Sequence, residues 1–166
     1  MEEQQANSVG DDWRSELAFP SLSQEMIERI RPYGREQTFR PGEVLYRCGD
    51  VDVGTFIVLE GGIDVTLPLT NGSSKITGRH RKFNFTGEFN LLNSQGAVVQ
   101  AETICESRLL CVLRKDLQRL MSAEGDIANL IVQAAILRRI AILNETSSGV
   151  TLVGRTDDAM TTQLRR

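Results

Sequence analysis

A stretch near the middle of the chain, Phe85–Leu92, has the residue types needed to hold an anion with its backbone. Gly87 has no side chain, so the backbone there can approach a ligand closely. Glu88 begins a segment as long as one helical turn, whose first N–H groups are free to point at a negative group. The Glu88 carboxylate suits a neutral hydroxyl, because it accepts a hydrogen bond and repels a second anion. The pattern indicates a small-anion site; the alternative is a solvent-facing Glu88 that caps the turn.

Residues for metal or redox chemistry are few. His80 is the only histidine, and the three cysteines (Cys48, Cys105 and Cys111) form no Cys-x-x-Cys pair. A metal site built on several histidines is therefore excluded, and we expect Cys105 and Cys111 to be thiols of the core. No Gly-x-Gly-x-x-Gly loop is present. We predict no catalytic residue, no metal site and no cofactor in this chain.

The composition bounds the class of protein. The chain has 166 residues, 40% of them hydrophobic and 25% charged, with a formal net charge of -3. This is typical of one globular domain, with room for a fragment of a second. The charge has the wrong sign for a dedicated nucleic-acid binder, and no apolar run is long enough to span a membrane. Unpaired cysteines in an odd number fit a reducing compartment, so we expect a cytoplasmic protein.

The first two thirds of the chain read as an arm, one short helix and then many strands. Residues 1–18 are polar and acidic and form an arm with Trp13 as its main apolar anchor. Ser21 and Gln24 have the spacing of a capping box, which predicts a helix that ends at Pro32–Gly34. Six short strand-like runs follow: 43–46, 55–59, 62–67, 82–85, 97–101 and 109–112. Short strands separated by turns, with Asn71-Gly72 as the strongest hairpin signal, predict an antiparallel sandwich or barrel.

The pattern changes to helix after Arg114. We predict a short helix at 116–121 and a longer one at 126–143, capped by Asp126. The longer helix has more apolar residues than one face can hold, with Val132, Ile136, Ile142 and Leu143 left over. An exposed apolar face of this kind marks an interface. We therefore expect a homodimer through this helix, with Arg138 and Arg139 at its rim.

The last residues predict the start of another unit. Residues 145–149 form a polar linker, and Val150–Val153 read as a buried strand followed by a helix near Thr156. A strand and part of a helix cannot bury a core alone. We therefore expect the chain to be a truncated part of a longer protein, with residues 150–166 beginning an α/β unit.

Taken together, several motifs resemble the cyclic-nucleotide-binding domain. They are Phe39-Arg-Pro-Gly-Glu43, Cys48-Gly-Asp50, Phe56–Gly61 and the cassette-like Phe85-Thr-Gly-Glu-Phe-Asn-Leu-Leu92. The resemblance implies that residues 19–144 form a mainly β jelly-roll barrel, a double-stranded β-helix, with one N-terminal and two C-terminal helices. It further implies that Glu88 holds a ribose 2′-hydroxyl and that the N–H groups of Gly87, Glu88 and Phe89 line the phosphate.

The chain departs from this family at the position of the phosphate-binding arginine. Gln95 or Gly96 occupies its place, with Ala97 next to them in the predicted site, and no Lys or Arg lies between Glu88 and Arg108. A neutral amide cannot replace that charge, and its loss costs about 2–5 kcal/mol in a desolvated site. We predict that the site binds cyclic AMP weakly, binds another small anion, or is empty. The basic run Arg79–Lys82 lies before the cassette and is expected on a solvated hairpin face.

The C-terminal part resembles thioredoxin-reductase-like flavoproteins that begin with such a domain. The residues concerned are Gln133–Ile140, the polar linker and Val150–Gly154. The resemblance implies a regulatory module for an attached oxidoreductase, with FAD and NADPH bound only in its downstream part. The alternative is a degenerate domain that serves in dimerisation. A catabolite-activator-type regulator would need a winged helix-turn-helix where a strand is expected, and a cupin enzyme would need several histidines.

Overall fold

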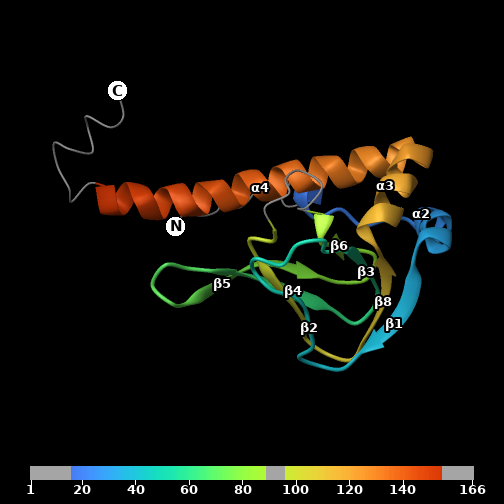
Figure 1. Cartoon of the computed structure of the whole chain (residues 1–166), viewed down its shortest axis with the longest axis horizontal. Coiled ribbons are helices and arrows are strands. Elements are labelled where there is room, and N and C mark those ends of the chain that lie inside the picture. Colours follow the sequence, from blue (N-terminus) through green and yellow to red (C-terminus); the bar gives the residue numbers. More distant parts are fainter. Residues whose placement is uncertain (1–15, 89–95, 155–166) are drawn as a thin grey trace, which may run out of the picture.

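The computed structural model describes residues 16–88 and 96–154, with side chains as far as Thr146. Its centre is a pair of four-stranded antiparallel sheets (Figure 1), with strand orders β1-β8-β3-β6 and β2-β7-β4-β5. The strands are β1 (Arg35–Phe39), β2 (Val44–Tyr46), β3 (Thr55–Glu60), β4 (Ile63–Pro68), β5 (Ser74–His80), β6 (Phe85–Thr86), β7 (Gln100–Thr103) and β8 (Ser107–Val112). The predicted mainly β jelly roll with flanking helices is confirmed.

The first sheet has apolar residues on both faces. In β3, Ile57 and Leu59 pack with the helices, whereas Val58 between them packs against the second sheet. Leu110 and Leu109 of β8 divide in the same way. Strands covered on both faces read as continuous apolar runs, which is why the sequence signals β3 and β8 so strongly.

Two strands, β1 and β5, were not predicted. Each lies at the edge of its sheet, and most of their residues are exposed. Neither has the apolar alternation that identifies a half-buried strand. The turn between β4 and β5 is the predicted Asn71-Gly72, with Gly72 at φ 86° and the Ser73 N–H donating to the Asn71 side chain.

Helical segments flank the sheets, among them α2 (Gln24–Ile30), the 3-10 helix η1 (Arg31–Tyr33), α3 (Arg114–Ala123) and α4 (Gly125–Gly154). The predicted cap of the first helix was wrong, because Ser23 rather than Ser21 accepts from the Met26 N–H. Figure 1 shows α4 passing along one side of the sheets, from α3 past the β4–β5 hairpin. None of the described helices is long and apolar enough to cross a membrane.

The C-terminal secondary structure differs from the expected one. Helix α4 includes residues 145–149, expected as a linker, and Val150–Val153, expected as a strand. The Thr146 hydroxyl donates to the carbonyl groups of Ile142 and Leu143, so this polar residue is accommodated within the helix rather than ending it. No proline interrupts this stretch. The proposed domain boundary therefore has no break in secondary structure at its position.

The cysteines also differ from expectation. Cys105 is exposed because it lies in the turn between β7 and β8 rather than in a strand, and Cys48 is exposed as well. Cys111 is partly buried, and burial raises the pKa of its thiol to about 11. Among the described residues no group of histidines, cysteines and acids could hold a metal ion.

Candidate ligand-binding site

The cassette glycine is required by packing. Gly87 follows β6 with φ 101°, and a Cβ there would lie 2.1 Å from the Gly54 carbonyl oxygen. The left-handed backbone and this close contact both exclude a side chain. Glycine at this position therefore sets the path of the chain into Glu88, whichever ligand the site holds.

Gly96 and Ala97 are used to hold a turn. Gly96 has φ 93°, and the Ala97 N–H and carbonyl form hydrogen bonds with Asp50 and Gly49 of the Cys48–Asp50 turn. Phe89 and Gln95, the other two predicted contacts, lie outside the described residues. Of the six residues predicted to bind a ligand, the structure thus describes Gly87, Glu88, Gly96 and Ala97.

Glu88 is completely buried rather than facing solvent. Its Oε1 accepts from Nη1 of Arg138 on α4, and its Oε2 has no partner among the described residues. The carboxylate predicted to receive a ribose hydroxyl is therefore already neutralised by a residue of the same chain. A buried charge needs such a partner, because removing an unpaired carboxylate from water costs several kcal/mol.

Arg138 was predicted at the rim of a dimer, and this was wrong. Only 4% of it is exposed, and its Nε donates to the Ala18 carbonyl at 2.6 Å while Nη1 donates to the Phe85 carbonyl at 2.9 Å. The guanidinium lies 4.8 Å from the Phe19 ring centroid and 4.9 Å from that of Phe85. It joins α4 to the segment before α2 and to the cassette.

A pattern in the sequence does place Arg138 inside. It is seven residues after Ile131 and four before Ile142, on the same side of α4 as these two buried residues. An arginine within an apolar stripe predicts a buried partner of opposite charge. That partner, Glu88, is 50 residues away, so its identity could not be read from the helix.

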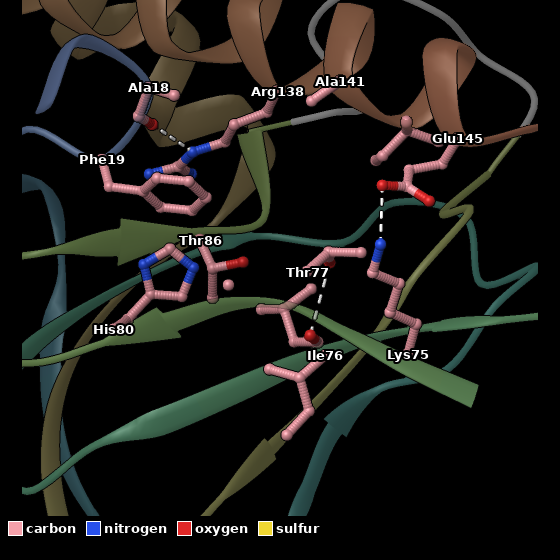
Figure 2. A pocket seen from close by; sticks show the side chains of 13 residues that line it. Ala18, Phe19, Lys75, Ile76, Thr77, His80, Thr86, Arg138, Ala141 and Glu145 are labelled. Carbon is pink, nitrogen blue, oxygen red and sulfur yellow. Dashed lines mark hydrogen bonds and ion pairs between the residues drawn. The ribbon is translucent and has the colours of Figure 1, made fainter. Parts of the chain in front are cut away.

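Beside Arg138 lies a cavity of about 180 Å³ between the β4–β5 hairpin and α4 (Figure 2). Figure 2 shows Arg138, Phe19 and His80 toward one end of it and the Lys75–Glu145 ion pair, at 2.6 Å, toward the other. Most of the remaining wall is apolar and includes Val65, Ile76 and Ile142.

His80 belongs to this cavity and not to a solvated face, so that part of the sequence interpretation was wrong. It is 1% exposed, and its Nδ1 has no partner among the described residues. Burial, with smaller contributions from Arg138 and Arg81, holds the pKa of His80 well below 6.5, so the ring is neutral at pH 7. The neighbours Arg79, Arg81 and Lys82 are exposed, as predicted.

A second buried polar pair lies at the cavity wall. The hydroxyl groups of Tyr46 and Thr86 share a hydrogen bond of 2.6 Å, and Thr86 lines the cavity. Burial raises the pKa of Tyr46, with a smaller contribution from the Glu88 carboxylate. Both hydroxyls are thus neutral and already partnered.

Comparison with known proteins points to one family. The family model described as "Cyclic nucleotide-binding domain" matches residues 36–124, a range that includes Glu88 but not Arg138. A search of curated sequences found no match.

Solved structures of transcription regulators share the fold. The catabolite activator protein of Thermus thermophilus is 18% identical, with 82% of this chain and 62% of that chain aligned at a TM-score of 0.61. A transcriptional regulator from Thermotoga maritima is 16% identical over 76% of this chain and 98% of that chain, with a TM-score of 0.60. The c-di-GMP-responsive regulator CLP of Xanthomonas campestris is 19% identical over 78% and 63%, with a TM-score of 0.61. The chain thus spans less than two thirds of the first and third of these proteins.

Proposed function

The chain belongs to the cyclic nucleotide-binding domain family, and on this basis we propose that it is a non-catalytic sensor domain for a small molecule. The ligand occupies the cavity between the β4–β5 hairpin and α4. The observation that supports this most is the place of the cavity, because its wall includes Arg138, whose guanidinium also binds Glu88 of the cassette.

Arg138 provides a route from the cavity to α4. The same guanidinium that borders the cavity holds Glu88, Phe85 and Ala18. A ligand that packs against the Arg138 side chain changes the balance of these bonds, and a helix held by a few discrete contacts can respond by shifting. We propose that α4 is the element that reports occupancy.

Hydrogen exchange can test this proposal. Cyclic AMP is added at millimolar concentration, so that it occupies a weak site. We then expect the hydrogen exchange of α4 amides near Arg138 to change, while the exchange of α2 amides remains the same. The shift of the Ile76 methyl signal, on the cavity wall, reports occupancy independently. Occupancy of the cavity with unchanged exchange in α4 would refute the sensor proposal.

The effector that the sensor controls is proposed from sequence alone. Residues Gln133–Ile140 resemble those of thioredoxin-reductase-like proteins and favour an attached oxidoreductase with FAD and NADPH in its downstream part. The expected strand at Val150–Val153 no longer supports this, because it lies in α4. A role in transcription regulation, the class named for the solved structures with the same fold, is the competing choice. A flavin absorbance spectrum of the full-length gene product would separate the two.

A ligand-free interaction domain is the alternative function. It is favoured by the Glu88–Arg138 pair, which uses one of the carboxylate oxygens predicted for a ribose, and by the exposed apolar residues of α4. In both cases we propose a homodimer through α4 and a location in the cytoplasm, where the three free cysteines would stay reduced.

A further inference from the structure

We propose that the cavity between the β4–β5 hairpin and α4 is also the docking site of the N-terminal arm, with the Trp13 side chain seated in it. The arm then closes the cavity from within the same chain when no ligand is bound. The docking itself is independent of the proposed function, whereas its consequence, competition with the ligand of the sensor, rests on that function.

The described part of the chain begins beside this cavity. It starts at Glu16, and Ala18 and Phe19 already form part of the cavity wall. Figure 2 shows both residues at the end of the cavity where Arg138 lies. They are held there, because Arg138 Nε donates to the Ala18 carbonyl and the Phe19 ring packs on Gly78 of β5. The arm therefore joins the rest of the domain at the cavity itself.

Trp13 is close enough in sequence to reach every part of the cavity. The cavity follows α4 from Arg138 to Glu145, seven residues or about 10 Å of helix. Trp13 is five residues before Ala18, and five extended residues span at most about 17 Å. Residues 16–18 are helical, and five residues of helix rise by only about 7.5 Å. An extended and a helical connection both bring the indole to the cavity.

The cavity has the walls that an aromatic ring needs. On one side lies β5, which pairs with β4 and with no other described strand, and proteins ordinarily cover such a free strand edge. Ala141 and Ile142 of α4 lie on the other side, and Val65 and Ile76 add to the apolar lining. The volume is about 180 Å³, and an apolar cavity of about 150 Å³ holds benzene. Ile76 is 44% exposed, so the space is open at the surface and a ring can enter it.

Charge complementarity favours the arm as the occupant. Residues 1–16 contain five acidic residues and one arginine. Strand β5 and the turn after it, residues 74–82, contain four Lys or Arg residues and no acidic residue. Opposite charges of this kind attract the arm to the hairpin and orient it there. Trp13 is the only aromatic residue among residues 1–16, so it is the side chain of the arm that gains most from the apolar space.

Docking of Trp13 places the arm and the ligand of the sensor in the same space. A ligand then binds by displacing the indole, so its apparent affinity is reduced by the fraction of chains whose cavity is free. Cyclic AMP at millimolar concentration enters the cavity and releases Trp13. The arm is thus an internal competitor that sets how much ligand the sensor needs.

The fluorescence of Trp13 tests the docking without a label, because the chain has no other tryptophan. We expect acrylamide to quench the indole severalfold less efficiently in the native chain than in urea. Ala141→Phe fills the cavity from α4 and should raise quenching toward the value in urea. Gln118→Phe adds the same ring at an exposed position of α3 and should leave quenching unchanged. Circular dichroism shows whether both variants are folded.

A variant of the arm gives a second readout that does not depend on filling the cavity. Trp13→Ala should shift the methyl signals of Ile76 and Ile142, because the ring beside them is lost. It should also tighten the binding of cyclic AMP severalfold, because the competitor is removed. Val9→Ala, which removes another apolar side chain of the arm, should do neither.

The outcomes separate the docking from the sensor function. An indole that is quenched as efficiently in the native chain as in urea overturns the docking and leaves the cavity to the ligand alone. Inefficient quenching that Ala141→Phe does not change also overturns it, because the indole is then buried elsewhere. Docking supported by both variants, with no effect of millimolar cyclic AMP on Trp13 fluorescence or on α4 exchange, keeps the docking and refutes the sensor proposal.

Discussion

Each face of α4 carries an exception to the usual distribution of side chains. The face on the sheets buries Arg138, while the outer face exposes Ile136, Ile140 and Leu143 by 45%, 48% and 51%. Buried charge and exposed apolar surface each cost stability in an isolated domain. We propose that both exceptions are used: Arg138 links α4 to the candidate site on one side, and the exposed apolar residues contact a partner on the other.

The largest effect is expected on the buried face. Arg138→Met leaves the Glu88 carboxylate buried without a partner, so it should lower the free energy of unfolding by about 3–5 kcal/mol. Adding Glu88→Gln removes the unpaired charge and should recover much of this loss. Urea denaturation of the single and double variants measures both. An equal loss of unfolding free energy in the single and double variants would show that the unpaired Glu88 charge is not the cause of the destabilisation.

The oligomeric state of the chain tests whether the outer face of α4 binds a second copy. We expect the wild-type chain to sediment as a dimer at tens of micromolar, because covering each exposed apolar side chain contributes about 1.5–3 kcal/mol. Ile136→Glu should yield monomers, whereas Ser122→Glu, which adds the same charge at an exposed position of α3, should not. A wild-type monomer would assign this face to another partner, such as a downstream domain.

The pH dependence of the free energy of unfolding reports on buried His80, because the chain has only one histidine. The pKa of His80 is held below 6.5 in the folded state, so the unfolded chain binds the proton more readily. Its contribution is present above pH 6.5 and is lost as the pH falls below that value, by at most about 1.4 kcal/mol per pH unit. His80→Gln should flatten the stability profile between about pH 6.5 and 5. An unchanged profile would mean that His80 is not the group that titrates.

An arginine at the surface provides the smallest expected effect. Arg29 of α2 bonds to Glu124 and Asp126 at the start of α4, where its guanidinium lowers the pKa of Asp126. The group is partly exposed, so Arg29→Met should cause a small loss that disappears in high salt. The pairing stabilises the fold at pH values above the ordinary pKa of Asp126 and is lost as the pH falls through the lowered value. A loss as large as that of Arg138→Met, measured in urea at low and high salt, would contradict the distinction between the two arginines.

The fold was largely predictable, and the exceptions have physical causes. The doubly covered strands β3 and β8 have apolar runs, whereas the edge strands β1 and β5 face water on most residues and lack any signal. Residues 145–149 were predicted as a linker because they are polar and include Gly149, yet α4 continues through them without a proline. Composition alone cannot separate a polar loop from a solvent-exposed helical segment.

The candidate site was predictable only in part. The motif around Gly87 and Glu88 was found from residue types, but the ion pair of Glu88 with Arg138 was not predicted. Its partner Arg138 is supplied by a distant helix, and His80 was taken for a surface residue because its neighbours are basic. Contacts between distant segments depend on the tertiary fold, which local patterns do not specify.

Calorimetric titration with cyclic AMP tests most directly whether this site still serves a cyclic phosphate. We predict weak binding to the wild-type chain, because Glu88 is neutralised internally and no arginine follows the cassette. Gln95→Arg, which restores a charge, should tighten binding by ~2 kcal/mol or more. Gly96→Arg is unsuitable, because a Cβ there would lie 2.8 Å from the Gly49 carbonyl oxygen. Submicromolar affinity of the wild-type chain for cyclic AMP would contradict the internal neutralisation of Glu88 as the feature that governs this site.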